Sequence, residues 1–138
     1  MLFVPYIMFD GNAAEALSFY EKILGAQKPP EVMLYGDAEG MEIPPGYEDK
    51  VLHAELSFPG GMIYISDSFS GAEVSYTDSI SFNLSPDSEE ALKDLFEKLS
   101  EGGTVVQPLK EEFWGAIFGS LNDKFGIHWS LNYQLPQK

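Results

Sequence analysis

Two stretches of the chain share one pattern and decide the fold. They are Asn12-Ala-Ala-Glu-Ala-Leu-Ser-Phe-Tyr-Glu-Lys-Ile-Leu and Asp87-Ser-Glu-Glu-Ala-Leu-Lys-Asp-Leu-Phe-Glu-Lys-Leu. In both, apolar residues recur at helical spacing, and glycine follows the last turn. The triplet Glu15-Ala-Leu recurs 75 residues later as Glu90-Ala-Leu, which is close to half of the 138-residue chain. We therefore expect two structural modules that arose by duplication; the alternative is a chance match between two amphipathic helices.

Both stretches begin with a residue that can cap a helix. Asn12 and Asp87 have short side chains that accept hydrogen bonds from backbone N–H groups. Glu15 and Glu90 stand three residues after them, as in a capping box. We therefore expect two helices that have Asn12 and Asp87 as their N-caps.

The remaining sequence predicts β-strands, because apolar and alternating runs are separated by glycine, proline and asparagine. The expected strands cover residues 4–9, 51–58, 62–67, 79–84, 104–108, 116–121 and 127–133. Each half is then a strand, a helix and about three further strands. We expect an α+β fold in a single domain over residues 1–138, with βαβββ modules at 1–70 and 76–138, joined through residues 67–78.

The composition limits the classes of function. The chain has 8 basic and 22 acidic residues and a formal net charge of -14. We expect no nucleic-acid partner and no anionic membrane surface, because both need basic residues, and a charge of this sign favours a cationic ligand. The chain has no cysteine, which excludes disulfides and thiol chemistry. With no basic signal-peptide region and no long apolar run, we expect a cytoplasmic protein.

Three expected strands each have one apolar and one polar side, because successive side chains on a strand face opposite sides of the sheet. The polar sides carry His53, Glu55, Ser57, Ser79, Ser81, Asn83, His128, Ser130 and Asn132. One interpretation is the solvated outer face of an antiparallel sheet. The other is the wall of a cavity, which is favoured because these residues are small or functional and include both histidines of the chain.

A set of short motifs runs through nearly the whole chain. The motifs are Pro5-Tyr-Ile-Met-Phe, Gly11-Asn, Glu15-Ala-Leu-Ser-Phe-Tyr, Leu24-Gly25, Tyr35-Gly-Asp37, Lys50-Val-Leu-His-Ala, Pro108-Leu, Phe113-Trp-Gly, Phe118-Gly and Asp123-Lys-Phe-Gly-Ile. Together they resemble the vicinal-oxygen-chelate superfamily, which includes glyoxalase I, the bleomycin-resistance proteins and the extradiol dioxygenases, and within it the PhnB-like branch. The resemblance implies two βαβββ modules that form a concave mixed sheet around a pocket, and a homodimer.

The resemblance also bears on metal binding. In metal-using members of the superfamily, four positions hold a divalent cation through His, Glu or Gln, and the matching positions here are Pro5, Glu55, Ser81 and Ser130. Of these only Glu55 is a good ligand, so the resemblance implies that the usual metal site and its Lewis-acid chemistry are absent. Some relatives carry a demethylubiquinone-methyltransferase label, but this sequence has no glycine-rich cofactor loop to support it.

The polar side and one aromatic residue supply the candidate site. The expected ligand-binding residues are His53, Ser81, Asn83, Trp114, His128 and Ser130. Trp114 is suited to stacking on a flat or cationic ligand. Glu55 is the candidate catalytic residue, because burial can raise a carboxyl pKa and make the group a general base. The repeat makes His128 the counterpart of His53 and Ser130 that of Glu55, so the two histidines and Glu55 are an alternative metal site.

Three hypotheses of function remain open on the sequence alone. The leading one is a dimeric, metal-independent small-molecule-binding protein of the PhnB-like type, with no cofactor. The second is a lyase, isomerase or dioxygenase that uses a divalent metal on His53, Glu55 and His128. The third is a metal-free catalyst with Glu55 as base. The acidic stretch 36–50 is a lid, a dimer contact or a plain solvated loop.

Overall fold

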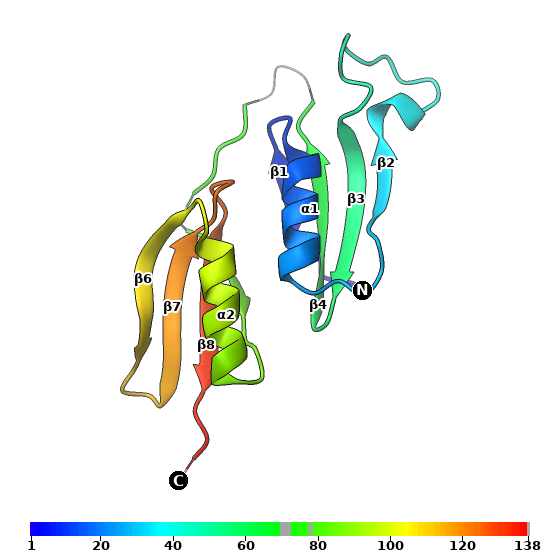
Figure 1. Cartoon of the computed structure of the whole chain (residues 1–138). Helices are drawn as coiled ribbons and strands as arrows, with labels where there is room; N and C mark the ends of the chain where they lie inside the picture. The colour runs from blue at the N-terminus through cyan, green and yellow to red at the C-terminus, as the bar shows by residue number, and fades with distance from the viewer. Residues whose placement is uncertain (70–72, 78, 138) are drawn as a thin grey trace. The chain divides into compact units, whose positions relative to one another are not determined.

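The computed structural model describes residues 1–69, 73–77 and 79–137. The chain forms two compact units, Met1–Ser75 and Tyr76–Lys138. In each unit one helix covers one face of a four-stranded mixed sheet (Figure 1). The α+β prediction is therefore confirmed. The expected connection 67–78 includes residues 70–72 and 78, which lie outside the described residues.

The first unit has the expected order of a strand, a helix and three strands. Its elements are β1 (Tyr6–Phe9), α1 (Ala13–Ile23), β2 (Glu31–Leu34), a short 3-10 helix (Tyr35–Asp37), β3 (Val51–Phe58) and β4 (Gly61–Asp67). The strands lie in the order β1-β4-β3-β2, with β1 parallel to β4 and the other pairs antiparallel. The sequence did not locate β2, because this edge strand is short and follows two prolines.

The second unit repeats the same topology. Its elements are β5 (Phe82–Leu84), α2 (Glu89–Ser100), β6 (Thr104–Glu111), β7 (Ala116–Asn122) and β8 (His128–Gln134). The strands lie in the order β5-β8-β7-β6, and β5 is parallel to β8. The strand expected over 79–84 is shorter than predicted, so Ser81 precedes β5.

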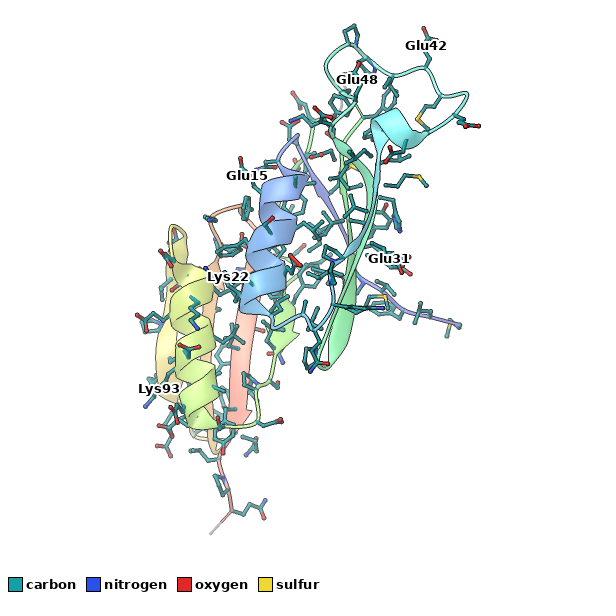
Figure 2. All side chains as sticks on the ribbon, turned by 45° about the vertical axis from the view of Figure 1, so that its right-hand side comes forward. Glu15, Lys22, Glu31, Glu42, Glu48 and Lys93 are labelled. Atoms are coloured by element: carbon teal, nitrogen blue, oxygen red, sulfur yellow. The ribbon has the colours of Figure 1, made fainter. Side chains whose placement is uncertain are left out.

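Each core lies between the helix and the sheet face that the helix covers. The largest fully buried apolar side chains are Phe9, Tyr20, Leu56 and Ile65 in the first unit and Leu92, Leu99, Leu121, Trp129 and Leu131 in the second. A side chain at Gly119 would come within 2.9 Å of Leu109 and Phe96, so this glycine lets α2 approach the sheet. Charged residues such as Glu15 and Lys93 are exposed on the helices (Figure 2).

The predicted helix caps need correction. Asn12 occupies the N-cap of α1, but its side chain makes no capping hydrogen bond. The carboxylate of Asp67 instead accepts a hydrogen bond from the N–H of Ala13 at 2.9 Å. In α2 the cap is Ser88 rather than Asp87, and its hydroxyl accepts from the N–H of Ala91 at 3.1 Å.

Each unit contains one buried aspartate that accepts several N–H groups. Asp67 ends β4 and accepts from Ala13 and Val51, both at 2.9 Å, so it joins the start of α1 to the start of β3. Asp123 follows β7 and accepts from the backbone of Phe125 and Ile127 and from the indole N–H of Trp129. A buried carboxylate is tolerated only when donors of this kind satisfy it.

The acidic loop 36–50 is fixed at both of its ends. The Tyr35 hydroxyl donates to the backbone oxygen of Asp67 at 3.0 Å, and the Tyr47 hydroxyl donates to the backbone oxygen of Ser68. Lys50 Nζ donates to the backbone oxygen of Gly11 at 2.7 Å. Between these contacts, acidic residues such as Glu42 are exposed (Figure 2). A lid or a dimer contact here stays a prediction.

None of the helices in the described part of the chain has the length and apolar character that crossing a membrane requires.

The two hydrogen bonds of Asp67 give a first prediction. Asp67→Asn keeps the size of the side chain but turns one acceptor into a donor that faces an N–H group. We expect the free energy of unfolding to fall by about 2–3 kcal/mol in urea denaturation. Asp49→Asn, in the exposed part of the loop, is the control and should change it by less than about 0.5 kcal/mol. Equal losses in both variants would contradict this role.

The corrected caps give a second prediction. Ser88→Ala removes a side-chain cap and should lower the free energy of unfolding by about 1 kcal/mol. Asn12→Ala removes a side chain that caps nothing, so the change should be clearly smaller. Thermal unfolding of the two variants side by side measures the difference, and a larger loss from Asn12→Ala would refute the assignment.

Candidate functional site

The sheet face turned away from α1 carries a row of functional side chains in the first unit. Tyr6 on β1 pairs in register with Tyr64 on β4, and Tyr64 pairs with Glu55 on β3. His53 lies two residues before Glu55 and on the same face. The side chain of Tyr6 is 52% exposed, while its neighbour Ile7, on the helix face, is 5% exposed.

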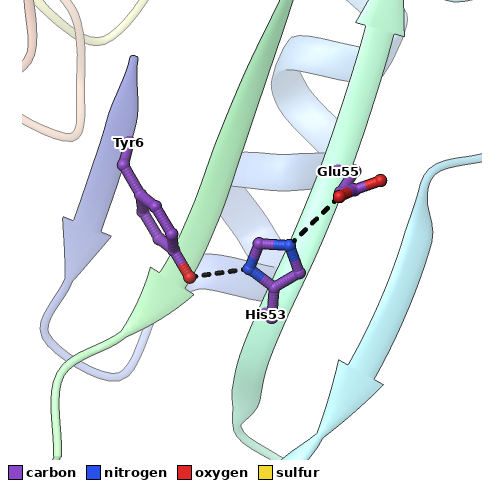
Figure 3. Close-up of polar contacts among 3 residues, drawn as sticks. All are labelled: Tyr6, His53 and Glu55. Atoms are coloured by element: carbon purple, nitrogen blue, oxygen red, sulfur yellow. Dashed lines mark hydrogen bonds and ion pairs between the residues drawn. The ribbon is translucent and has the colours of Figure 1, made fainter. Parts of the chain in front are cut away.

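Hydrogen bonds join these side chains (Figure 3). The Tyr6 hydroxyl lies 2.7 Å from His53 Nδ1, and His53 Nε2 lies 3.4 Å from Glu55 Oε1. The imidazole ring also packs against both phenol rings, with centroids 5.4 Å from Tyr6 and 5.0 Å from Tyr64. The His53 and Glu55 side chains are 37% and 36% exposed, so a small molecule can reach them.

Tyr64 completes the row as a hydrogen-bond donor. Desolvation raises the pKa of its phenol above the ordinary value, and the Glu55 carboxylate raises that pKa further through its charge and its hydrogen bond to the phenol. Tyr64 therefore stays protonated, and its hydroxyl donates a hydrogen bond to the Glu55 carboxylate. The carboxylate thus has two partners, Tyr64 and His53.

The sequence predicted part of this row. Alternation along β3 placed His53 and Glu55 together on one face, and the structure brings them together. Tyr6 was missed, because tyrosine counts as apolar in a hydrophobic pattern. The available signal was the alternation of Tyr6 and Met8 with Ile7 and Phe9 in β1, whose exposed and buried residues alternate.

The corresponding face of the second unit has uncharged polar groups. Ser130 Oγ donates to Asn83 Oδ1 at 3.0 Å, and Asn83 pairs in register with Ser130. His128 Nδ1 lies 2.6 Å from Asn122 Oδ1. Of the predicted binding residues in this unit, Asn83, His128 and Ser130 therefore lie on one sheet face, as the alternation predicted.

The other two predicted residues of the second unit lie elsewhere. Ser81 is exposed and precedes β5. Trp114 is 49% exposed in the turn between β6 and β7, next to the rings of Phe113 and Phe118 at 5.1 and 6.3 Å. It lines a groove of about 630 Å³ together with Gln134 and other residues near the end of the chain.

The expected equivalence of His53 with His128 is wrong. His53 and Glu55 lie on β3, whereas His128 and Ser130 lie on β8, and the strand orders make β3 equivalent to β7 and β4 equivalent to β8. The two helices start at residues 13 and 89, a separation of 76 residues. The equivalent strands β3 and β7 start at residues 51 and 116, a separation of only 65 residues. The loop 36–50 has no equally long counterpart between β6 and β7, so one fixed separation cannot align both modules.

The donor set does not fit the metal site of the metal-using members of the superfamily. Pro5 has no donor side chain, and Ser81 is a weak ligand. Ser130 lies on β8, so it is also not the counterpart of Glu55 on β3. The remaining ligand, Glu55, already accepts hydrogen bonds from Tyr64 and His53. Within the described residues, no group of three or more His, Asp or Glu side chains is arranged to hold a metal ion. The alternative site on His53, Glu55 and His128 draws on both units and stays a prediction.

Comparisons with known proteins find relatives that match nearly the whole of this chain. It matches the family described as 3-demethylubiquinone-9 3-methyltransferase over residues 2–132. It is 30% identical over 141 residues to Protein YjdN of Escherichia coli K12, covering 93% of this chain and 92% of that protein. The structure of protein PA1353 from Pseudomonas aeruginosa is 34% identical, with a TM-score of 0.86 and 99% of both chains covered.

A second solved structure carries the family name. The Bacillus cereus protein described as a putative 3-demethylubiquinone-9 3-methyltransferase, PhnB protein, is 28% identical, with a TM-score of 0.79 and coverage of 96% of this chain and 99% of that one. Structures described as glyoxalase/bleomycin resistance/dioxygenase proteins share the fold. The chain therefore belongs to the family described as 3-demethylubiquinone-9 3-methyltransferase, in which the Bacillus cereus relative is called a PhnB protein, and it has the glyoxalase/bleomycin-resistance fold.

Proposed function

We propose that this chain is a metal-independent binding protein for a small organic molecule that carries a positive charge. One observation carries the proposal: the hydrogen-bonded row of Tyr6, His53, Glu55 and Tyr64 on the open sheet face of the first unit. The row combines aromatic rings with a carboxylate, and these are the groups that attract an organic cation.

The geometry of the row supports this choice of ligand. The phenol rings of Tyr6 and Tyr64 lie 5.7 Å apart and meet edge to face, and Tyr6 is 52% exposed, so a cation can reach its ring. Glu55 is one-third exposed and supplies a negative charge beside the rings. The net charge of -14 adds long-range attraction for a cation.

The open face of the second unit offers polar groups of its own to a small polar ligand. Asn83, His128 and Ser130 present amide, imidazole and hydroxyl groups that both donate and accept. Trp114 adds a half-exposed indole face on the same unit. We assign these residues to ligand binding, as the sequence predicted.

The fold of this chain does not support the methyltransferase activity that the family name mentions. Each unit is one helix on a small mixed sheet, and the described residues contain no glycine-rich loop between a parallel strand and a helix to hold a nucleotide-like cofactor. A divalent-metal lyase, isomerase or dioxygenase on His53, Glu55 and His128 is the second candidate. It is favoured by the exposure of His53 and Glu55 side by side.

We also propose that the protein acts in the cytoplasm as a homodimer. The absence of cysteine suits a reducing compartment. The resemblance to the superfamily supports the dimer, and β6 adds an edge strand on which Val105 and Val106 are 43% and 50% exposed.

Binding of a cation is tested with benzyltrimethylammonium as the probe and benzyl alcohol as its neutral counterpart. In NMR titrations we expect the cation to shift signals of Tyr6 and Tyr64 and the alcohol to bind more weakly. Glu55→Gln should raise the Kd of the cation about fivefold, which is roughly 1 kcal/mol for a charge that is one-third exposed. Glu15→Gln removes the same charge from α1 and is the control, with an unchanged Kd. Equal binding of both probes would contradict the proposal.

Metal dependence is tested by elemental analysis and by thermal shifts with Mn, Fe, Ni and Zn salts. A specific ion would stabilise the folded protein by mass action, so we expect Tm to stay within about 1 °C for each salt. Stoichiometric metal that is lost on His53→Ala or Glu55→Gln would establish the second candidate and overturn metal independence.

A further inference from the structure

Tyr6, His53 and Glu55 have the order of a reacting hydroxyl, a base and a group that orients the base. The ionised Glu55 carboxylate can only accept hydrogen bonds, so His53 carries its proton on Nε2, which faces Glu55 at 3.4 Å. Nδ1 is then unprotonated and accepts a hydrogen bond from the Tyr6 hydroxyl, whose oxygen lies 2.7 Å away. The phenol oxygen is thereby aligned with a base that can take its proton.

We propose that Tyr6 is a base-activated nucleophile and a site of covalent acylation by small activated acyl compounds. Tyr6 would be the reacting residue, His53 its general base and Glu55 a positioning residue. This activity goes beyond ligand binding and does not depend on the charge of any ligand.

The reaction balances without a metal or a redox partner. The Tyr6 oxygen attacks the carbonyl carbon of the acyl donor, and the phenol proton passes to His53 Nδ1. A carbon–oxygen bond forms to Tyr6, and the bond between the carbonyl carbon and the leaving group breaks. The leaving group departs with the bonding electron pair and takes the proton from His53, which returns to its neutral form. The product is an acyl ester of Tyr6.

The surroundings of the base support this assignment. The charged and titratable groups that face it are Tyr6 from β1, Tyr64 from β4 and Glu55 from its own strand, and Glu31 on β2 lies opposite Glu55. Met33 is the residue opposite His53 on β2. No positive side chain stands among these groups, so an imidazolium formed in the reaction faces only neutral and negative neighbours.

Tyr6 is also reachable. Its side chain is 52% exposed, and β1 is an edge strand of its sheet. Tyr76, which is 41% exposed, provides an internal reference for a phenol of similar access in the same molecule. The ratio of the two rates corrects for exposure, and the change of this ratio in His53→Gln reports activation by the base.

The experiment treats the full chain with N-acetylimidazole and follows each acetylated tyrosine by peptide mass spectrometry. Removal of the acetyl group by hydroxylamine identifies phenol esters. We expect Tyr6 to react at least about tenfold faster than Tyr76, because a positioned general base contributes on this scale or above it. His53→Gln should bring the two rates together, and its Tm is measured beside the wild type. A wild-type ratio below tenfold, or one that survives His53→Gln, overturns the proposal.

The role of Glu55 has its own control. Glu55→Gln should slow acetylation of Tyr6, whereas Glu15→Gln removes an exposed carboxylate from α1 and should leave the rate unchanged. An amide can donate as well as accept, so Glu55→Gln should also move part of the His53 proton from Nε2 to Nδ1, visible in the nitrogen-15 shifts of the ring. Equal rates in the two variants, or an unchanged tautomer, would refute the positioning role. Neither readout depends on the binding of a cation, so acylation and ligand binding can fail separately.

Discussion

The carboxylate of Asp67 is the constraint on which the first unit depends. It ends β4, yet its two oxygens accept from the N–H groups of Ala13 and Val51, which begin α1 and β3. Negative charge at the start of α1 suits the helix dipole and replaces the missing side-chain cap. Because Val51 is two residues before His53, the same contact fixes the strand end that carries the functional row. Asp67 is buried and bound to these partners, so its role is structural, although a buried aspartate could be taken for a catalytic residue from its type alone.

In the second unit a different aspartate, Asp123, holds the ends of the elements in place. Asp123 lies in the turn between β7 and β8, where it accepts two backbone N–H groups and the indole N–H of Trp129. The aspartate therefore fixes the start of β8, and with it His128 and Ser130. The two units thus have equivalent topology but different anchors and different open faces. One face carries phenols and a carboxylate, and the other carries amide and hydroxyl groups.

The sequence predicted most of the architecture, because helical spacing and alternation are local signals. It placed both helices and the extent of β3 closely, and alternation put His53 and Glu55 on one face. What it missed depends on contacts between distant residues: the Asp67 bond to Ala13 spans 54 residues, and the Tyr6 bond to His53 spans 47. The misaligned histidines have a related cause. A single repeat separation was read from the helices, while a loop in one module shifts every strand that follows it.

Glu55 is the residue at which metal binding and the hydrogen-bonded row would compete. An ion bound at Glu55 would take oxygen lone pairs that now accept from Tyr64 and His53. Metal coordination and the hydrogen-bonded row are therefore alternative uses of one carboxylate. Pro5, just before β1, has no side chain that could bind a metal. The next residue, Tyr6, has its phenol on the open face, where it hydrogen-bonds to His53. The hydrogen-bonded side chains of this face are therefore donors, acceptors and bases, and the chemistry that we propose for them passes through protons.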